Sequence, residues 1–306
     1  MTPSRQTIRF ALSLSLALFV ASSAKAAEAL PFTVVLLPDT QLYCESFPDT
    51  YVTQTRWIRD QAKKENIKFV IHLGDIVQNP DSEEEWKVAD RAHQVLDGVI
   101  PYSMLPGNHD MIETDTTLYN KYFPPRRFAK QPWYGGQLDD KNDNNFCLFE
   151  AGGLKFMVLS LQFAPGDEQI DWASRIIQGH PTRRVVLATH DYLMPDNRRS
   201  ETGERLWQRL VRNHPAVFMV VSGHRSVVGL KTSTNDAGGR VHEILTDYQA
   251  LPNGGNGWLR LLRFVPGENK IHIRAYSPLL DENHKHPAHT YTLDYDMNSE
   301  ILKKAG

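Results

Sequence analysis

The chain has 306 residues, with 34 Lys and Arg against 36 Asp and Glu. This balance does not favour nucleic acid as a general partner, because such binding depends on neutralising many phosphates with basic side chains, and it equally disfavours an anionic membrane surface. The length allows one large domain or two small ones. No linker, repeat or low-complexity tract divides it, so we predict one domain over residues 27–306.

Residues 1–26 are predicted to be a secretory signal peptide. Arg5 and Arg9 precede an apolar run at 10–20, and Ala-Lys-Ala at 24–26 supplies a small-x-small cleavage site. The apolar run is too short to remain as a membrane anchor. Cleavage would leave 31 basic and 36 acidic residues, a net charge of −5. We therefore expect a periplasmic or secreted protein with no stable membrane anchor; an uncleaved N-terminal anchor is the alternative.

Buried strands alternate with amphipathic helices through the first half of the mature chain. Strands are predicted at 32–37, 68–73 and 102–105, and helices at 51–65 and 82–96. Ser82 followed by Glu85 forms a capping box that opens the second of these helices. This order of elements predicts an α/β fold with buried strands.

The second half of the chain is richer in strands. Runs at 145–150 and 154–160 flank a Gly-Gly pair and predict a hairpin. Further strands are predicted at 185–189, 217–222, 241–245, 258–265, 270–276 and 290–294, with helices at 167–179 and 203–213. The last three strands alternate in part, as in a sheet with one exposed face. Two sheets packed face to face, with helices outside, would satisfy the pattern.

Five of the predicted strands end in a short loop that carries a metal-competent side chain. These side chains are Asp39, Asp75, Asn108, His190 and His224. Ligands of α/β sheets bind beyond the carboxyl ends of the strands, and carboxylate, amide and imidazole donors together suit Mn, Fe or Zn. Each residue alone could be a turn or cap residue, but their repetition at five strand ends indicates a site.

The motifs around these residues resemble those of the calcineurin-like metallophosphoesterase family. That family carries Asp-x-His, Gly-Asp, Gly-Asn-His, a lone His and Gly-His-x-His in this order. The matching segments here are Asp39-Thr40-Gln41, Gly74-Asp75, Gly107-Asn108-His109-Asp110, Thr189-His190 and Gly223-His224-Arg225-Ser226. The Pro-Asp-Thr-Gln start at 38–41, with Gly-Gly-Asn-Gly-Trp-Leu-Arg at 254–260, looks like an exported bacterial branch. The resemblance implies a four-layer α/β/β/α sandwich of two mixed sheets.

The resemblance also implies a centre of two divalent ions. Asp75 would bridge them, Asn108, His190 and His224 would complete one position, and Asp39 with Gln41 would belong to the other. His109 would act as a general acid or stabilise charge on the leaving oxygen, and Asp110 could orient it. The implied activity is hydrolysis of a phosphomonoester or phosphodiester by in-line attack of a metal-bound hydroxide on phosphorus.

Two departures from the family pattern concern the same metal position. Gln41 and Ser226 stand where the family usually has histidines, so we expect this position to be weaker and richer in oxygen donors than its partner. Asp247 and Gln249 follow a predicted strand and either could compensate; Tyr43 is a more remote candidate.

Other polar residues allow either a functional or a purely structural interpretation. Arg225, Gln249 and Asn256 could contact substrate. Alternatively, Arg225 could be an exposed arginine, and Asn256 could belong to a tight glycine-rich turn. The polar cluster of His284, His286 and His289 could bind metal but resembles a solvated loop, and His72, inside an apolar strand, is predicted to be a core histidine.

The sequence leaves several properties open. A hydrolase acting on a phosphorylated small molecule or a phosphodiester is the first hypothesis; a non-catalytic protein that binds metal or a phospho-ligand on the same scaffold, and a structural protein, are the alternatives. The natural substrate, the ester preference, the metals and the oligomeric state are not determined. Cys44 and Cys147 could form one disulfide in an oxidising compartment or remain packed thiols.

Overall fold

The computed structural model describes Met1 and residues 29–297, and within this range the strands form two mixed sheets of seven strands each. The first has the order β13-β12-β11-β1-β2-β3, with β14 paired to β12, and the second the order β4-β5-β6-β7-β8-β10-β9. The first sheet comprises β1 Phe32–Leu37, β2 Ile67–His72, β3 Tyr102–Ser103, β11 Leu259–Val265, β12 Lys270–Ser277, β13 Glu282–Asn283 and β14 Thr290–Asp294. The second comprises β4 Tyr134–Gln137, β5 Asn145–Ala151, β6 Leu154–Leu161, β7 Arg184–Thr189, β8 Val217–Ser222, β9 Val228–Thr234 and β10 Arg240–Thr246.

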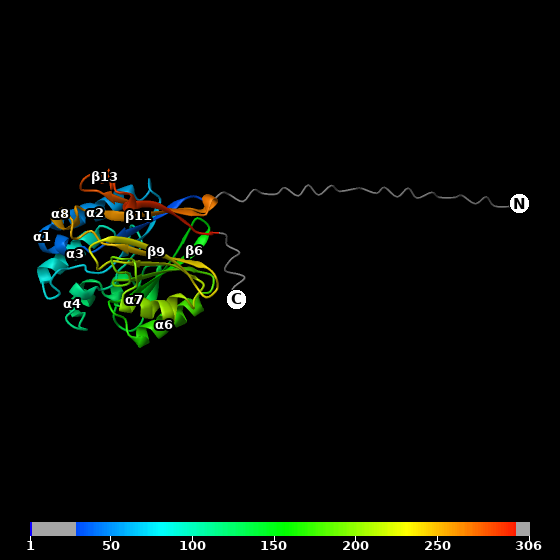
Figure 1. Cartoon of the computed structure of the whole chain (residues 1–306), viewed down its shortest axis with the longest axis horizontal. Helices are drawn as coiled ribbons and strands as arrows, with labels where there is room; N and C mark the ends of the chain where they lie inside the picture. Colours follow the sequence, from blue (N-terminus) through cyan, green and yellow to red (C-terminus); the bar gives the residue numbers. More distant parts are fainter. Residues whose placement is uncertain (2–28, 298–306) are drawn as a thin grey trace.

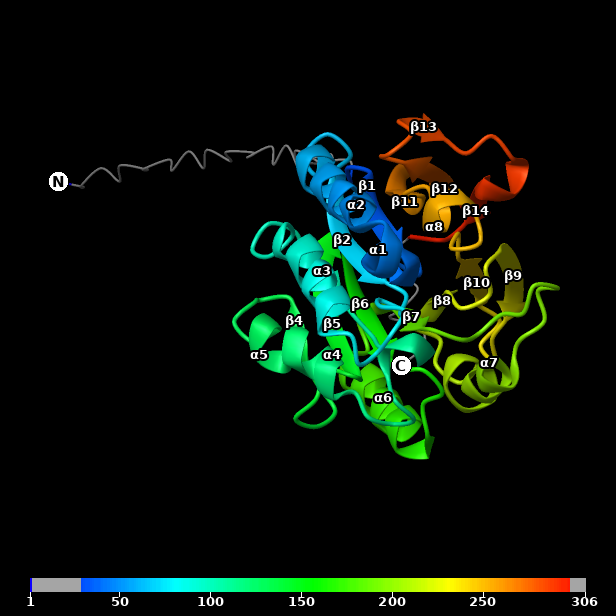
Figure 2. The ribbon, with the colours of Figure 1, turned by 90° about the vertical axis from the view of Figure 1, so that its left-hand side faces the viewer.

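Helices cover the outer faces of the two sheets. They are α1 Gln41–Ser46, α2 Pro48–Gln61, α3 Glu83–Gln94, α4 Thr117–Tyr122, α5 Pro125–Phe128, α6 Asp167–Gly179, α7 Glu201–Leu206 and α8 Pro252–Gly255, with a π-helical turn at Trp207–Val211 and 3-10 turns at Asn108–Asp110, Pro266–Glu268 and Pro287–His289. In Figure 1, α2 lies at the upper side of the molecule and α6 and α7 at the lower side, with β6 and β9 between them. Figure 2 shows the same separation from a second direction.

The alternation of side chains along β1 explains how one strand serves two layers. Phe32 and Val34 point into the core between the sheets, where they join Phe156 of β6. Val35 and Leu37 point the other way, into the core beneath the helices of the first sheet. Because successive side chains of a strand face opposite sides, a continuously apolar strand buries both of its faces.

The second sheet repeats this division between two cores. Val158 of β6 faces the core between the sheets, whereas Met157 and Leu159 pack against Ile170 and Trp172 of α6. The molecule is therefore a helix–sheet–sheet–helix sandwich, which confirms the α/β four-layer fold that the sequence predicted.

Most predicted elements are present, and the errors lie at their ends. The strands at 32–37, 217–222 and 290–294 have the predicted bounds, and the hairpin of β5 and β6 is present. The helix predicted at 51–65 begins earlier, because Pro48 occupies its first turn, where a fixed φ suits a helix. It also ends earlier, at Gln61, and the turn that follows leads into β2 through left-handed Asn66.

Several short elements were not predicted. The clearest is β9, an edge strand that pairs only with β10 and keeps most of its side chains partly exposed. Its pairing comes from the backbone, so it carries no strong pattern of apolar residues. Helix α1 has only six residues, too few for a periodic signal.

Two sequence predictions concern the signal peptide and membrane-spanning segments. The predicted signal peptide, apart from Met1, lies outside the described residues. Among residues 29–297, no helix is long and apolar enough to cross a membrane.

Both cysteines are buried free thiols. Cys44 packs in the core beneath α1, α2 and α3, and Cys147 packs in the core between the two sheets. The disulfide that the sequence left open is absent from the structure, because the first sheet separates the two cores.

Candidate metal centre

The carboxyl ends of parallel strands from both sheets meet at one edge of the sandwich. Strands β1 and β2 are parallel neighbours in the first sheet, as are β7 and β8 in the second. The loops after β2, β7 and β8 bring Asp75, His190 and His224 together, with one ligand atom of each within 4.8 Å of the others. His190 Nε2 lies 3.1 Å from Asp75 Oδ2. Residues far apart in the sequence thus converge because their strands end at the same edge.

The loops that carry these side chains have unusual backbone conformations. Asp75 has φ 50°, His224 has φ 78° and Ser226 has φ 40°, all in the left-handed region. Such conformations cost about 1–3 kcal/mol each in residues other than glycine and concentrate at functional sites. The surrounding structure therefore holds these loops against local strain.

Two motif glycines give the carboxylates the space that they occupy. A Cβ atom at Gly107 would overlap Asp75 Oδ1, and one at Gly223 would overlap Asp39 Oδ1. Any larger residue would push the carboxylate out of the centre. The glycines of the Gly-Asn-His and Gly-His segments thus have a packing reason that the sequence alone did not reveal.

Three residues of the sequence motifs have buried oxygen atoms without hydrogen-bond partners. Asp39 Oδ1, Gln41 Oε1 and Asn108 Oδ1 are buried and unpartnered within the described part of the chain. His190 Nδ1 lies 2.8 Å from the backbone oxygen of Leu73, which leaves its Nε2 for the centre. Buried acceptors cost free energy unless something satisfies them, and a ligating histidine usually donates its other ring nitrogen in this way.

The ionisable groups in the centre perturb one another strongly. Burial would raise the pKa of Asp75, but the positive charge of His190 and its hydrogen bond outweigh burial and lower it. Burial would lower the pKa of His190, yet Asp75 and Asp39 raise it to about 10. Burial, with the positive charges of His190 and Arg225, lowers the pKa of His224 to about 4. A cation at His190 would compete with a proton for the same nitrogen.

A second group of acidic residues lies beside Asp39. Burial, followed by the negative charge of Asp247, raises the pKa of Asp39 well above its usual value. Asp39 Oδ2 accepts a hydrogen bond from the backbone of His224 at 3.0 Å. Asp247 accepts hydrogen bonds from the backbone of Ser226 and, at 2.9 Å, from the backbone of Gln249. Asp247 therefore occupies the neighbourhood of Ser226, where the family usually has a histidine.

The donor set fits divalent cations. Carboxylates, amide oxygens and imidazoles are oxygen and nitrogen donors, and a mixed set of this kind binds Mn, Fe or Zn. Of the six residues named from the sequence, Asp75, His190 and His224 come together, and Asp39, Gln41 and Asn108 have buried oxygens without hydrogen-bond partners.

His109 lies at the edge of the centre. Its backbone N–H donates to Asp75 Oδ1 at 2.9 Å, and its Nδ1 lies 3.0 Å from the backbone oxygen of Gln78. Nδ1 is therefore the donor of the pair. The remaining nitrogen, Nε2, is the atom that can exchange a proton with a ligand.

The prediction that Asp110 orients His109 is wrong in its geometry. The Asp110 carboxylate is buried and accepts hydrogen bonds from the backbone of Ile76, Val77 and Gly107, at 2.7 to 3.1 Å. Burial, with the charge of Asp75, raises the pKa of Asp110 to about 7. Asp110 fixes the two loops that carry Asp75 and Asn108, and neighbouring sequence positions did not mean contact between the side chains.

The residues suggested for substrate contact have partners within the protein. Arg225 pairs with Asp191 at 3.3 Å, although its Nε is buried and has no hydrogen-bond partner. Gln249 donates from Nε2 to Asp247 at 3.1 Å. The Asn256 side chain accepts from Asn253 at 2.8 Å, within the glycine-rich loop.

Tyr43 and His72, which the sequence also brought into consideration, form hydrogen bonds within the protein. The Tyr43 hydroxyl accepts a hydrogen bond from the backbone of Gly257 at 3.0 Å, so it supports the glycine-rich loop. The two ring nitrogens of His72 lie 3.0 Å from Thr40 Oγ1 and 3.1 Å from the backbone nitrogen of Gly74. His72 is thus a core histidine, as predicted.

Sequence reasoning missed three residues around the centre. Gln78 contacts both Gln41 and His109, and Glu85 holds the loop of Gln78. Phe163 places its ring 5.5 Å from that of His224 and 6.0 Å from that of His190. Only the position of Gln78, three residues after Asp75, could have drawn attention to it; nothing in the sequence points to Phe163.

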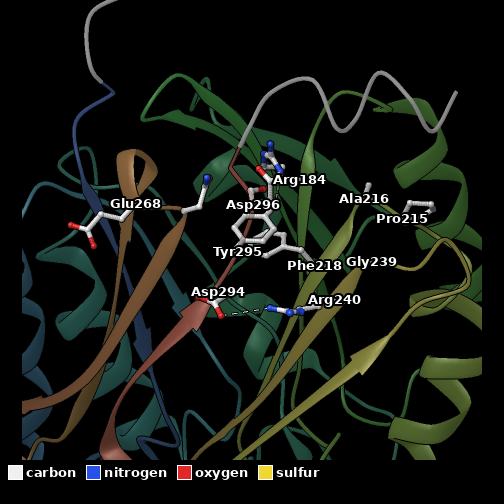
Figure 3. Close-up of a pocket in the computed structure, with 11 residues that line it drawn as sticks. Arg184, Pro215, Ala216, Phe218, Gly239, Arg240, Glu268, Asp294, Tyr295 and Asp296 are labelled. Carbon is white, nitrogen blue, oxygen red and sulfur yellow. Dashed lines mark hydrogen bonds and ion pairs between the residues drawn. The ribbon is translucent and has the colours of Figure 1, made fainter.

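A separate cavity of about 470 Å³ lies at the other edge of the second sheet. Arg184 and Arg240, which line it, are the first residues of β7 and β10, whereas the centre follows the last residues of β7 and β8. Figure 3 shows Arg240 directed at Asp294 and the ring of Tyr295 beside Phe218. The cavity and the centre are therefore at opposite ends of the strands.

The chain matches known proteins over most of its length. The model of the calcineurin-like phosphoesterase family matches residues 32–227. An uncharacterised protein of Bacillus subtilis (strain 168), YvnB, is 37% identical over 287 residues, 89% of this chain; the chain spans only 22% of that relative. Among solved structures, the purple acid phosphatase PPD1 from yellow lupin seeds has a TM-score of 0.56 at 13% identity, covering 89% of this chain and 55% of that one. GAP50, the anchor in the inner membrane complex of Plasmodium, has a TM-score of 0.50 at 12% identity, covering 90% and 94%.

The structural similarities show a shared fold, and the sequence match shows the family. The matched residues include every strand that carries a candidate ligand, from β1 to β8. The chain belongs to the calcineurin-like phosphoesterase family.

Proposed function

We propose that this protein is a metal-dependent hydrolase of phosphomonoesters or phosphodiesters. The observation that carries the proposal is the convergence of Asp75, His190 and His224, with ligand atoms within 4.8 Å of one another. The unpartnered buried oxygens of Asp39 and Asn108 beside them support it further. Family membership supports the reaction class, and the substrate would be a phosphorylated small molecule or a phosphodiester.

Each residue has a distinct proposed role. Asn108, His190 and His224 would hold one divalent ion, Asp39 and Gln41 a second, and Asp75 both. Such ions stabilise negative charge on phosphoryl oxygens and lower the pKa of bound water. His109 would exchange a proton with the leaving oxygen through Nε2, because its Nδ1 faces the backbone oxygen of Gln78.

The test is hydrolysis of p-nitrophenyl phosphate and bis-p-nitrophenyl phosphate by the purified protein with Mn, Zn, Fe or Mg. Turnover should require metal and should disappear in His224→Ala. His272→Ala is a matched control, because His272 is a half-exposed histidine on β12. The preferred ester would choose between monoesterase and diesterase. Equal turnover in His224→Ala would remove the proposal.

A non-catalytic protein that binds metal or a phospho-ligand is the alternative. The observation that favours it is the replacement of two family histidines by Gln41 and Ser226 in one metal position. GAP50, which shares the fold, is described as an anchor, so the fold alone does not decide between enzyme and binder. Tight metal binding without turnover on any phosphoester would favour this alternative.

We also propose that the protein is exported after cleavage behind residue 26. The proposal rests on the basic, apolar and small-residue segments within residues 1–26. N-terminal sequencing of the mature protein should begin at Ala27, and a retained Met1 would contradict it.

A further inference from the structure

Two glutamine side chains meet beside the candidate metal centre. Gln41 is the first residue of α1 and Gln78 lies in the loop between β2 and α3. Gln41 Nε2 donates a hydrogen bond to Gln78 Oε1 at 2.9 Å. Gln41 is only 4% exposed and Gln78 is half-buried, so the bond is partly shielded from solvent.

The bond decides which atom of Gln41 remains available. A glutamine amide has one donor end and one acceptor end. Because Gln78 takes the donor end, Gln41 Oε1 is left buried and without a partner. Asp39 Oδ1, two residues earlier in the chain, is buried and unpartnered as well. This short segment thus offers two buried oxygens without hydrogen-bond partners.

Gln78 is itself held in place from both sides. Its backbone N–H donates to Glu85 Oε2 at 2.8 Å, and its backbone oxygen lies 3.0 Å from His109 Nδ1. Gln78 therefore contacts Gln41 through its side chain and His109 through its backbone. A substitution of the side chain changes the first contact and keeps the backbone oxygen of the second. Partners of this kind, one step away from a ligand, fix the orientation of the ligand.

The charges around Asp39 suit a cation at this position. Asp247 is 1% exposed, accepts from the backbone of Ser226, and its negative charge acts on Asp39. The position therefore contains carboxylate and amide oxygens where family members have imidazoles. Oxygen donors of this type suit hard cations such as Mg²⁺ and Mn²⁺.

We propose that Gln78 is a positioning residue that makes Gln41 a carbonyl-oxygen ligand of a second cation, in an oxygen-donor position completed by Asp39 and Asp75. The proposal rests on the metal centre of the proposed function. It adds the residue that sets the donor atom. Without Gln78, the Gln41 amide is free to rotate and can turn its NH₂ group towards the cation.

The experiment measures Mn²⁺ binding to chelator-treated protein by isothermal titration calorimetry and by the electron paramagnetic resonance of free Mn²⁺, without substrate. The wild-type protein should bind two ions per chain in a tight and a weaker step. Gln78→Leu should weaken the second step by about 10- to 100-fold, the usual effect of removing a partner of a metal ligand. Gln78→Glu keeps an acceptor for Gln41 Nε2 and should restore the second step.

Two further variants separate positioning from general destabilisation. Gln54→Leu removes another fully buried glutamine, whose Nε2 donates to the Trp258 backbone oxygen at 3.0 Å, and should leave the second step unchanged. Gln41→Leu should weaken the second step as Gln78→Leu does. In the double variant, Gln78→Leu should add nothing further, because Gln78 acts only through Gln41.

The opposite results would overturn the inference. They are a single Mn²⁺ per wild-type chain, an unchanged second step in Gln78→Leu, equal losses in Gln78→Leu and Gln54→Leu, or additive losses in the double variant. Binding is measured without substrate, so a protein that fails to hydrolyse phosphoesters can still satisfy the inference. If the protein hydrolyses phosphoesters but Gln78→Leu binds the second ion as tightly as the wild type does, this inference is refuted and the proposed function is not.

Discussion

At the scale of single residues, the centre depends on which atom each side chain presents. His109 is placed by two backbone contacts, one to Asp75 and one to Gln78, and neither involves its Nε2. We predict that His109→Ala lowers kcat by about 10²- to 10⁴-fold, the usual contribution of a general acid. Its metal content should be unchanged, because its side chain is not among the ligands. Steady-state kinetics with metal analysis checks this, and full activity in the variant would remove the role.

A second prediction at this scale concerns the space around Asp75. In Gly107→Ala the added methyl group would overlap Asp75 Oδ1, so the carboxylate must move. Metal affinity should fall and the free energy of unfolding should fall by about 1–3 kcal/mol, as in overpacked sites. Gly179→Ala, with nothing within 4 Å of the new methyl group, is the matched control. Calorimetric metal titration and urea unfolding measure both quantities; equal metal affinity in the two variants would contradict the prediction.

The residue scale also shows the limits of sequence motifs. The motif positions of Asp75, His190 and His224 were readable from the sequence, since each follows a buried strand. The roles of Asp110 and Gln78 were not readable, because hydrogen bonds between loops depend on the folded backbone. Asp110 looked like a partner of its neighbour His109 but bonds to Ile76, Val77 and Gly107 instead.

At the scale of elements, the loop between β2 and α3 joins the centre to a helix. Ser82 caps α3 by accepting from the backbone of Glu85. The Glu85 side chain does not complete the predicted capping box; it accepts from the backbone of Gln78 and Asn79 at 2.8 and 3.0 Å. The first turn of α3 thus fixes the loop that contacts Gln41 and His109.

We predict that Glu85→Ala loosens this loop, because two partly buried N–H groups lose their acceptor at about 1–3 kcal/mol each. Hydrogen exchange at Gln78 and Asn79 should accelerate while exchange in the β strands is unchanged. Glu84→Ala is the control, since the Glu84 side chain is 84% exposed and pairs with Lys87. Unchanged exchange at Gln78 in Glu85→Ala would show that the loop is held by other contacts.

At the scale of the whole molecule, the two sheets are joined by their apolar core and by the centre at one edge. A cation there would bind the folded state only, because the unfolded chain does not bring the ligands together. We predict that Mn²⁺ at about 100 times its Kd raises the free energy of unfolding by about 2.7 kcal/mol. Thermal unfolding with Mn²⁺ and with chelator measures the shift. An unchanged Tm would contradict metal binding, and His224→Ala should lose most of the shift.

The separation of the cysteines by the first sheet leads to another prediction at this scale. Burial raises the pKa of both thiols, and a buried thiol reacts slowly. Ellman's reagent should therefore modify neither cysteine in the native protein and both after denaturation, and reductant should not change Tm. A mass 2 Da below that of the dithiol protein would reveal a disulfide and contradict the packing.

The sequence by itself determined the layers and the family of this protein. Buried strands alternating with amphipathic helices predicted an α/β fold, and the resemblance of the motifs to the calcineurin-like metallophosphoesterases implied the four-layer sandwich. The motifs from Asp39 to Ser226 indicated the candidate ligands, because each follows a predicted strand.

Only the tertiary structure decided how the ligands are held and which atoms they present. Gln41 and Gln78 are 37 residues apart, and Asp39 and the backbone of His224 are 185 apart. Contacts over such separations arise when strand ends from two sheets meet, and no local pattern encodes them. The edge strand β9 could not be predicted for a related reason. Its backbone forms hydrogen bonds with β10, and this pairing does not require a particular pattern of side chains in β9.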